Sequence, residues 1–499
     1  MNINKNVLLI GFYNEKALGV RYLYRALKER GYIPHTVYFK AFNSLVPQSA
    51  TEKELALLRR IIEEIGPVCI GMSVMSSLYL ETTHKVSRML RESFPELPVI
   101  WGGVYATLEP RRALEHCDIV LRGEGEDAIV ETVEALSEGR DWRGIQNAAY
   151  IDGSGEFVEN PLRPLADIDR FGWPPIGGDN IYLIHNDELS KGDPQLKSYT
   201  YELCASRGCP FSCSYCSSIN IQRLYRGLGK YVRFRSVGSV MDELREAKRK
   251  IPKLRVVHFW DEIFSDEPGW VEEFARRYKT EIGLPFRIWG HPLKASENTI
   301  SHLVGAGLHQ IVMGIQSGSE GLRRETFNRR ETQAQILEAS RVLAKCRVPV
   351  VYYDFMLCHP FESAEQLKET FELCMELEPP FKLNIHGLNF LPATDIVGMA
   401  IEQGVYKQEE LDKMMYSSIQ DQYDQYWGPN ASSFDGDSNL WISLIYLTQF
   451  PKIKDKVRAL SQDADNKERE IHALRHKMER AQRFGELAEK AKLVLKIGR

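Results

Sequence analysis

Short apolar runs alternate with amphipathic segments over the first 145 residues, and this alternation constrains the fold more than any other feature. Five runs have the length and apolar character of buried strands, and segments with helical spacing lie between them. Strands that alternate with helices form parallel sheets with right-handed crossovers, so residues 1–145 are predicted to form a doubly wound, Rossmann-like α/β domain. The five runs are residues 6–12, 35–39, 68–74, 98–103 and 118–123.

The rest of the chain is predicted to contain three further parts. Residues 146–195 are rich in proline and glycine, which indicates a linker. In residues 196–400 a second series of six strand–helix units predicts a partial (β/α)6 TIM-type barrel, with its active site at the carboxyl ends of the strands. Residues 401–499 are predicted to be a helical C-terminal domain. Its last helix is interpreted as a packed amphipathic helix with a solvated basic side, the alternative being a helix that contacts a partner or a membrane.

Composition and charge exclude several classes of protein. The chain has 499 residues and a formal net charge of −4, so no chain-wide basic field favours nucleic acid. The apolar run near the N-terminus is too short for a signal peptide, and residues 440–447 are too short to span a membrane. Nine cysteines in a chain of this length do not make a disulfide scaffold. The protein is predicted to be cytoplasmic.

Three of these cysteines, Cys209, Cys213 and Cys216, stand at CxxxCxxC spacing in the stretch RGCPFSCSYC. Thiolate ligands select zinc, Cu(I) or iron–sulfur clusters, and structural zinc sites take four ligands, usually as two pairs. No matching downstream pair exists. Three thiolates on an iron–sulfur cluster leave one iron without a protein ligand, where a substrate or cofactor can bind. Zinc and a purely structural cluster are the alternatives.

This stretch resembles the cysteine motif of the radical S-adenosylmethionine enzymes. The resemblance implies that the three cysteines hold a 4Fe–4S cluster and that S-adenosylmethionine chelates the fourth iron. One-electron reduction by an external donor, such as flavodoxin or ferredoxin, would then yield a 5′-deoxyadenosyl radical. Cys204, five residues before the motif, is interpreted as a strand residue that faces the core.

Other segments of residues 196–400 resemble motifs of the same family. The stretch FWDEIF is similar to an acidic motif whose carboxylates reach ribose hydroxyls or substrate, although such acids also cap helices. In GIQSGS a glutamine replaces the usual glutamate. The implied contacts to S-adenosylmethionine are Tyr215, Asp261, Glu262, Gln316, Ser317 and Ser319.

Candidates for catalysis lie near the ends of later strands. Tyr352, Tyr353 and Asp354 are candidate proton acceptors or substrate contacts. Cys358 and His359 occupy a turn where relatives often carry a GxPGET-like sequence, and a role near the substrate is considered for them. The stretch LNFLPATDI resembles a PxPGT loop that has lost its second proline and its glycine.

The strand ends of the first domain resemble the cobalamin-binding domain of B12-dependent radical S-adenosylmethionine enzymes. The stretches GMSVMSS, WGGVYAT and RGEGE offer hydroxyls, close backbone approach and carboxylates to a flat ligand. No GxGxxG follows the first strand, which disfavours a nicotinamide site, and no DxHxxG precedes residue 150, so no histidine is expected below cobalt. The alternative is a substrate-binding or purely structural domain. The implied contacts are Gly11, Gly19, Ser73, Val74, Ser76, Ser77, Gly102, Gly103, Tyr105, Thr107, Glu124 and Glu126.

These observations together predict a cobalamin-dependent radical S-adenosylmethionine methyltransferase that acts on an unactivated centre of a small molecule, apolar or ring-bearing in character. The alternative with the same cofactors is cyclisation, ring contraction or hydroxylation without methyl transfer. A non-enzymatic iron–sulfur protein is the third reading. The cofactors would carry the difficult chemistry, while the protein orients them and excludes quenching.

Overall fold

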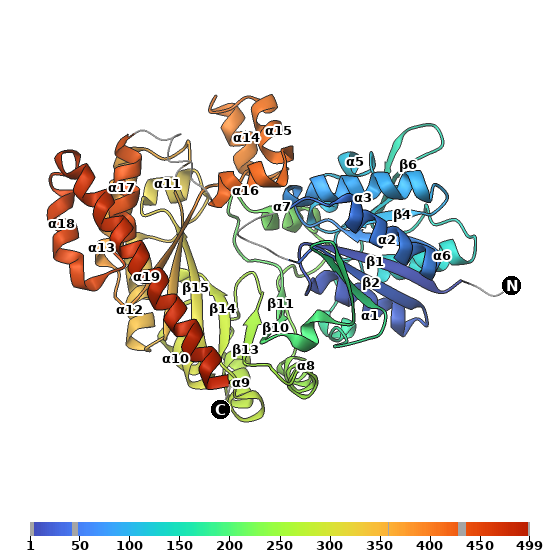
Figure 1. Ribbon diagram of the computed structural model, residues 1–499, viewed down its shortest axis with the longest axis horizontal. Helices are drawn as coiled ribbons and strands as arrows, with labels where there is room; N and C mark the ends of the chain where they lie inside the picture. The colour runs from blue at the N-terminus through green and yellow to red at the C-terminus, as the bar shows by residue number, and fades with distance from the viewer. Residues whose placement is uncertain (1–3, 42–47, 358, 428–435, 498–499) are drawn as a thin grey trace. The chain divides into compact units, whose positions relative to one another are not determined.

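The computed structural model describes residues 4–41, 48–357, 359–427 and 436–497 (Figure 1). By its internal contacts the chain divides into two compact units. The first unit comprises Met1–Trp289, Ser301–His309 and Asn389–Asp424. The second comprises Gly290–Ile300, Gln310–Leu388 and Gln425–Arg499.

A nine-stranded sheet forms the core of the first unit, with the strand order β7-β6-β5-β4-β3-β1-β2-β8-β9. Its first five strands pair in parallel, as predicted for a doubly wound domain. These strands are β1 (Asn6–Phe12), β2 (Ile33–Phe39), β3 (Ile70–Ser73), β4 (Val99–Gly102) and β5 (Ile119–Leu121). The helices between and after them are α1 (Leu18–Glu29), α2 (Glu52–Ile65), α3 (Leu80–Ser93), α4 (Val104–Leu108), α5 (Pro110–Ala113) and α6 (Glu126–Ser137).

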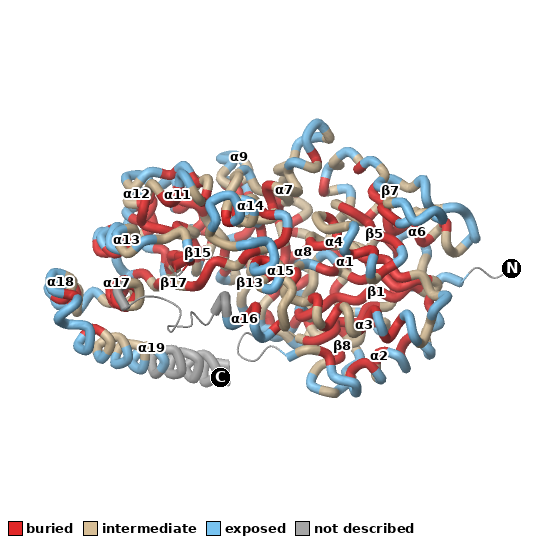
Figure 2. The backbone as a smooth tube through the Cα atoms, turned by 90° about the horizontal axis from the view of Figure 1, so that it is seen from above, coloured by how far each residue is buried: buried red, intermediate tan, exposed pale blue. Residues whose placement is uncertain are grey.

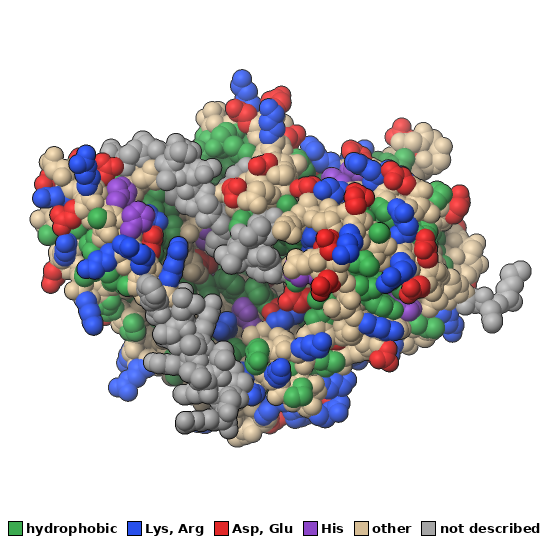
Figure 3. Space-filling view, in the orientation of Figure 1, with side chains coloured by type: hydrophobic (Ala, Val, Ile, Leu, Met, Phe, Trp, Pro, Cys, Tyr) green, Lys and Arg blue, Asp and Glu red, His purple; other side chains and the backbone are tan. Residues whose placement is uncertain are grey.

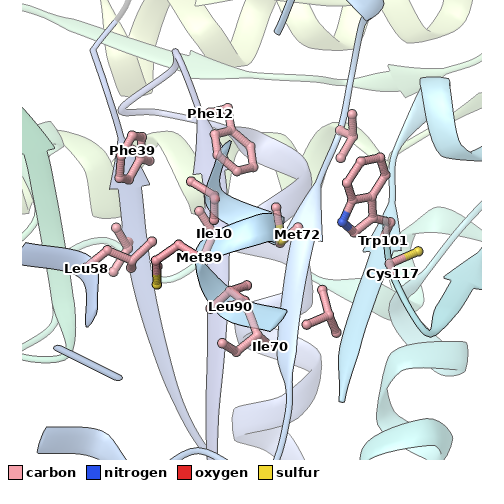
Figure 4. Packing of buried hydrophobic residues seen from close by; sticks show 14 of the residues in the cluster. Ile10, Phe12, Phe39, Leu58, Ile70, Met72, Met89, Leu90, Trp101 and Cys117 are labelled. Carbon is pink, nitrogen blue, oxygen red and sulfur yellow. The ribbon is translucent and has the colours of Figure 1, made fainter. Parts of the chain in front are cut away.

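Side chains of β1 alternate between two hydrophobic layers, one on each face of the sheet. Leu8 and Ile10 pack with residues of α2 and α3, including Leu58 and Met89 (Figure 4). Val7 and Leu9 belong to the opposite layer, which is built with α1 and α6. The strands are buried while the outer faces of the helices are exposed (Figure 2). Burial on both faces explains why these strands are continuous apolar runs.

Residues 146–195 are not a separate linker, because four of the nine strands lie there. β6 (Ala148–Ile151) and β7 (Phe157–Glu159) form an antiparallel hairpin on the β5 edge. β8 (Ile181–His185) pairs with β2 and turns into β9 (Glu188–Lys191). Asn186 and Asp187 make that turn with φ of 52° and 62°, a geometry typical of tight hairpins. The proline and glycine content obscured these short strands.

Six further strands form a second sheet in sequential order, as the barrel prediction requires. Pairs of known register are parallel, for example Tyr201 opposite Val257 and Tyr352 opposite Lys382. The strands are β10 (Thr200–Leu203), β13 (Val256–Phe259), β14 (Phe286–Gly290), β15 (Leu308–Gln316), β16 (Val350–Met356) and β17 (Lys382–His386). The main helices of this series are α8 (Val237–Lys250), α9 (Pro268–Arg277), α10 (Glu297–Ala306), α11 (Glu320–Glu325), α12 (Gln333–Lys345) and α13 (Ala364–Glu376).

The C-terminal region is helical, but its helices divide between the two units. α14 (Asp395–Glu402), α15 (Gln408–Tyr416) and most of α16 (Ile419–Trp427) belong to the first unit. α17 (Gly436–Leu447), α18 (Lys454–Ser461) and α19 (Glu468–Ile497) belong to the second, where α17 packs on α13 and α19. Ile471 of α19 is fully buried, and Arg475 donates to Ser443 Oγ on α17. The described part of α19 is therefore a packed helix.

The surface carries both signs of charge. On the face seen in Figure 3, lysine and arginine side chains are intermixed with aspartate and glutamate. Among the helices in the described ranges, none is long and apolar enough to cross a membrane.

Gly318 tests the packing of the second unit. A Cβ at Gly318 would lie 2.2 Å from the Thr370 Cα of α13, whereas a Cβ at Gly321 would meet only Ser319 Oγ, at 3.9 Å. Gly318→Ala should therefore destabilise the protein by about 1–3 kcal/mol, because backbone must move. Gly321→Ala should change stability by less than about 1 kcal/mol, in the stabilising direction. Urea unfolding followed by circular dichroism measures both, and equal midpoints for the two variants would contradict the packing.

Candidate functional site

The cysteine loop begins from a short ladder and ends at a helix. β11 (Ser206–Arg207) pairs antiparallel with β12 (Arg233–Phe234), and α7 (Ser217–Leu224) starts directly after Cys216. Gly208 has a φ of +89°, and a Cβ there would lie 2.6 Å from the Tyr231 carbonyl oxygen. The turn into the loop therefore requires glycine.

All three predicted cluster ligands lie in this loop and are half-buried. Burial, together with the Glu262 carboxylate and the neighbouring thiols, raises the pKa of Cys209 and Cys216 to about 12. Hydrogen bonds from the backbone of Phe211 and Ser218 act in the opposite direction, favouring thiolates. A bound cluster, whose iron ions are positively charged, would favour the thiolate form of these cysteines further.

The donor set fits an iron–sulfur cluster. Three soft thiols in one loop are the ligand type that such clusters take. Among the described residues, no three histidine, cysteine, aspartate or glutamate side chains are placed to hold a single metal ion. A cluster differs from a single ion because its cysteines bind different irons. Cys209, Cys213 and Cys216 stay the predicted ligands.

Asp261 anchors the strand that leads into the loop. Its carboxylate is 2% exposed and accepts hydrogen bonds from the Ala205 N–H, at 3.1 Å, and from the Ser206 hydroxyl. Neither predicted role, a ribose contact or a helix cap, matches these partners. Burial raises its pKa to about 6, although the hydrogen bonds from Ser206 and Ala205 oppose the rise. Glu262, the next residue, is exposed and remains free to serve as a predicted contact.

The segment that resembles a PxPGT loop packs on the cysteine loop. Ile396 donates its N–H to the Ser214 carbonyl at 3.0 Å, and Asp395 forms an ion pair with Arg223 of α7. Ala393 in this segment has a φ of +61°. The backbone thus keeps a left-handed conformation that glycine adopts more easily. Tyr215, the predicted adenine contact, lies in the loop and is half-buried.

A cavity of about 360 Å³ lies at the carboxyl ends of the first-domain strands. This is where ligands of doubly wound sheets bind. Six of the predicted cobalamin contacts line it: Gly19, Ser73, Gly102, Gly103, Glu124 and Glu126. The remaining wall is mainly apolar and consists of residues such as Leu9, Leu18, Leu23, Met72, Met75, Ile100, Leu121 and Ile129.

The glycines of β4 bring backbone to the cavity wall. Gly103 has a φ of +97°, and a Cβ there would lie 2.6 Å from the Val74 carbonyl oxygen. Met75 is 52% exposed, unusual for so large an apolar side chain beside a cavity. A bare backbone floor and an apolar wall fit a flat, largely apolar macrocycle. The residues present therefore fit cobalamin.

The other six predicted contacts do not line this cavity, and all of them except Ser77 have structural partners. The Thr107 hydroxyl donates to the Gly103 carbonyl and accepts from the Gly123 N–H. Ser76 caps the turn before α3, and Tyr105 is a buried residue in the hydrophobic layer. Of the three remaining residues, Gly11 packs against Val20, and the backbone of Val74 is hydrogen-bonded to Gly102 and Tyr105. Ser77 is buried, and its hydroxyl has no hydrogen-bond partner among the described residues.

No histidine of the first 150 residues is among the described residues that line the cavity. His84 and His116 stack on each other with ring centroids 3.8 Å apart, and both lie near Trp101. His35 Nε2 lies 3.3 Å from Asn6 Oδ1, within hydrogen-bonding distance.

The carboxylates of Glu124 and Glu126 are engaged by arginines and are not open acceptors for ligand amides. Arg207 pairs with both, and Arg233 pairs with Glu124. Burial alone would raise the pKa of Glu124, but the hydrogen bonds and charges of Arg233 and Arg207 hold it below its ordinary value. A role for Arg207 could have been inferred from the sequence, because this residue directly precedes the turn into the cysteine motif.

Cys204 was misplaced by the sequence interpretation. It follows β10 and lines the cavity together with Arg207, whereas Leu203 beside it is buried. Burial raises its pKa well above the ordinary value. Alternation along the strand explains the error: Cys204 shares a face with Glu202, and Leu203 occupies the core face.

In the second unit, the serines of GIQSGS stabilise the turn rather than present free hydroxyls. Ser317 Oγ accepts from the Ser319 N–H, and Ser319 caps α11. Gln316 has a φ of +74°, and its Oε1 is buried with no hydrogen-bond partner among the described residues. Gln316 is therefore the member of this motif that keeps an acceptor for a ligand.

The three candidates on β16 point to two different faces. Tyr353 is 1% exposed, contacts Phe381 and is hydrogen-bonded to Ser340 of α12, so it faces the helical layer. Tyr352 and Asp354 lie on the other face. Asn384 donates to Asp354 Oδ1 at 2.7 Å, and burial raises the pKa of Asp354 to about 6.

His359 packs among aromatic rings in the same unit. It is 3% exposed, its ring lies 5.2 Å from that of Phe327, and burial lowers its pKa to about 3. It is a neutral core residue at neutral pH. Cys358 lies outside the described residues.

Asp261 gives a pH-dependent prediction. Its folded-state pKa, about 6, lies above the ordinary 3.8, so the carboxyl's contribution to stability is present in acid and is lost as the pH rises through about 6. Asp261→Asn removes this ionisation. The free energy of unfolding of the wild type relative to Asp261→Asn should fall by up to about 3 kcal/mol between about pH 4 and pH 7. Urea unfolding of the cluster-free chain measures it, and a pH-independent difference would contradict the assignment.

Two families match successive parts of the chain. The B12 binding domain matches residues 12–133, and the radical SAM superfamily matches residues 203–374. The first match covers the domain that holds the cavity, and the second begins just before the cysteine loop. These families carry cobalamin in the first case and a 4Fe–4S cluster with S-adenosylmethionine in the second.

Relatives and solved structures agree with this order of domains. An uncharacterized methyltransferase of Pyrococcus horikoshii is 25% identical over 72% of this chain and 73% of its own length. The anaerobic magnesium-protoporphyrin IX monomethyl ester cyclase of Cereibacter sphaeroides is 27% identical over 72% of this chain, but over only 56% of its own length. The radical S-adenosylmethionine methyltransferase TsrM from Kitasatospora setae has a similar fold, with a TM-score of 0.64 and 17% identity over 80% of this chain and 76% of its own. With an apolar cavity at its first sheet and three cysteines in the loop that follows, this chain combines a domain of the B12 binding family with a domain of the radical SAM superfamily.

Proposed function

We propose that this chain is a methyltransferase that modifies an unactivated centre of a small molecule. The observation that carries the proposal is that the cavity and the cysteine loop belong to one compact unit, and that Cys204 and Arg207, which stand shortly before Cys209 in the chain, line the cavity. When bound, the cluster and S-adenosylmethionine supply hydrogen abstraction, and cobalamin supplies the methyl group. A chain that provides the cavity and the cysteine loop in one compact unit suits a reaction that needs both cobalamin and the cluster.

The protein's own residues hold and shield these groups. Cys209, Cys213 and Cys216 provide thiolates, and Asp261 keeps the strand before them in place. The apolar wall of the cavity excludes water, which would otherwise quench reactive species. Gln316 offers a buried acceptor in the second unit.

An apolar or ring-bearing substrate is part of the proposal. His258 lies on β13, and Trp260 directly follows that strand. Their ring centroids are 4.4 Å apart, and the ring centroid of Trp289 on β14 lies 5.9 Å from that of Trp260. Trp260 is 44% exposed. These rings share the strand face opposite the helix-packed Phe259, and they offer a stacking surface. The aromatic stretch at residues 423–430 lies partly outside the described residues.

Two further features complete the proposal. The proposal includes an external one-electron donor such as flavodoxin or ferredoxin, because reductive cleavage of S-adenosylmethionine consumes one electron. A cytoplasmic location suits the described cysteines, none of which is in a disulfide.

The stoichiometry of products tests the reaction type. The reconstituted enzyme is given reductant, S-adenosylmethionine and a small-molecule extract of the source cells. Methyl transfer should release S-adenosylhomocysteine and 5′-deoxyadenosine in equal amounts. Cyclisation, which the cyclase relative keeps as the second candidate, should release only 5′-deoxyadenosine. Cys209→Ala should abolish both products, while Cys346→Ala, at the end of α12, should leave them unchanged.

The two faces of β16 give a second test. If Asp354 accepts a proton, Asp354→Asn should lower turnover by about 100-fold or more, and the wild-type rate should fall as the pH drops below about 6. Tyr353→Phe should leave turnover within about twofold and cost about 1 kcal/mol of stability, because only the bond to Ser340 is lost. The reverse ranking in turnover would exclude Asp354.

A further inference from the structure

Two elements that flank the cysteine loop converge on one strand end of the first domain. Arg207 lies on β11, two residues before Cys209, and forms ion pairs with Glu126 and, at 3.4 Å, with Glu124. Arg233 stands opposite Arg207 on the β11–β12 ladder and also pairs with Glu124. Arg207 and Glu126 are respectively 24% and 6% exposed at their side chains, so these pairs are shielded from solvent.

A third element, the end of α7, meets the same strand end. The Tyr225 hydroxyl accepts a hydrogen bond from the Glu124 N–H at 2.7 Å, and Tyr225 is 3% exposed. Gly123 has a φ of +70°, and a Cβ there would lie 1.9 Å from Tyr225 Oη. Any side chain at position 123 would therefore collide with the Tyr225 hydroxyl where it now lies. Asn147 donates to the Glu124 carbonyl at 3.0 Å and holds the segment from the opposite side.

The residues of this network are also cavity wall. Gly123, Glu124, Glu126 and Arg207 all line the cavity. The Arg207 guanidinium lies 4.9 Å from the ring centroid of Tyr22, another lining residue. A ligand in the cavity therefore touches the same side chains that hold β11, β12 and the end of α7. Because α7 begins directly after Cys216, these elements set the two ends of the cysteine loop.

We propose that Glu124 and Arg207 are positioning residues that couple the two cofactor sites, so that filling the cavity stabilises the loop that receives the cluster, and the cluster in turn tightens binding in the cavity. Coupling between two binding equilibria is reciprocal by thermodynamic necessity. The inference rests on the proposed function, because it takes the cavity as the cobalamin site and the three cysteines as cluster ligands.

A merely structural role for the network makes a different prediction. If Glu124 and Arg207 only support the fold, their loss weakens cobalamin binding equally with and without the cluster. Coupling predicts that the ratio of the two affinities changes. That ratio is the quantity to measure, and it does not require turnover or a known substrate.

The experiment titrates hydroxocobalamin into the full chain under anaerobic conditions, once in the cluster-free form and once after cluster reconstitution. Absorbance gives both dissociation constants. The wild type should bind at least about fivefold more tightly with the cluster, the lower end of typical coupling. In Glu124→Gln, which keeps the shape and loses the charge, the ratio should fall below about twofold. The electron paramagnetic resonance signal of the reduced cluster should shift on adding hydroxocobalamin in the wild type only.

Asp127→Asn is the matched control. Asp127 neighbours Glu126 but forms an exposed pair with Arg170, and it should keep the wild-type ratio. Tyr225→Phe is the second variant if Glu124→Gln fails to fold; it removes the acceptor of the Glu124 N–H and should also lower the ratio. A wild-type ratio near one overturns the coupling and leaves the proposed function standing. If Glu124→Gln and Tyr225→Phe both keep the wild-type ratio, the assignment of the positioning residues is overturned. If the wild type binds no hydroxocobalamin in either form, the proposed function fails and the inference with it.

Discussion

The structure depends on the ion pairs that Arg207 and Arg233 form with Glu124 and Glu126. Two carboxylates at a sheet edge would normally face solvent or a ligand. Here they are paired with two guanidinium groups, so the local charge is balanced without an external ion. Losing one partner would leave a partly buried charge uncompensated, which is far more costly than losing an exposed pair. The first domain and the cysteine loop are held together at this point.

Further buried pairs extend the same attachment within the first unit. Arg21 of α1 forms a bidentate pair with Asp193, and both side chains are almost fully buried. Lys16, in the loop after β1, pairs with Glu202 of β10 at 2.9 Å. These ion pairs thus help to join the first sheet to the start of the second series. Paired charges demand one geometry, whereas apolar surfaces tolerate sliding.

Much of the site was accessible from short-range patterns. Cysteine spacing, the glycines that follow β4 and the strand–helix alternation are local features, and each follows from backbone sterics or ligand chemistry. Residue-level roles were harder to assign. Thr107, Ser317 and Ser319 carry hydroxyls at strand ends or turns, yet each bonds to nearby backbone. A hydroxyl near a strand end satisfies its own turn as readily as a ligand.

The sequence by itself determined the alternation of strands and helices in residues 1–145 and 196–400, and with it the doubly wound first domain and the six-stranded second series, as well as the three cysteines in one loop. Tertiary structure decided which side chains remain available. Tyr353 faces helices while Asp354 does not, because neighbouring residues of a strand point to opposite faces, and the sequence VVYYDFM does not show which face the helices cover. Glu124 is paired because Arg233, 109 residues further along the chain, folds back beside it. Partners so distant in sequence leave no local pattern, and only the folded chain brings their charges together.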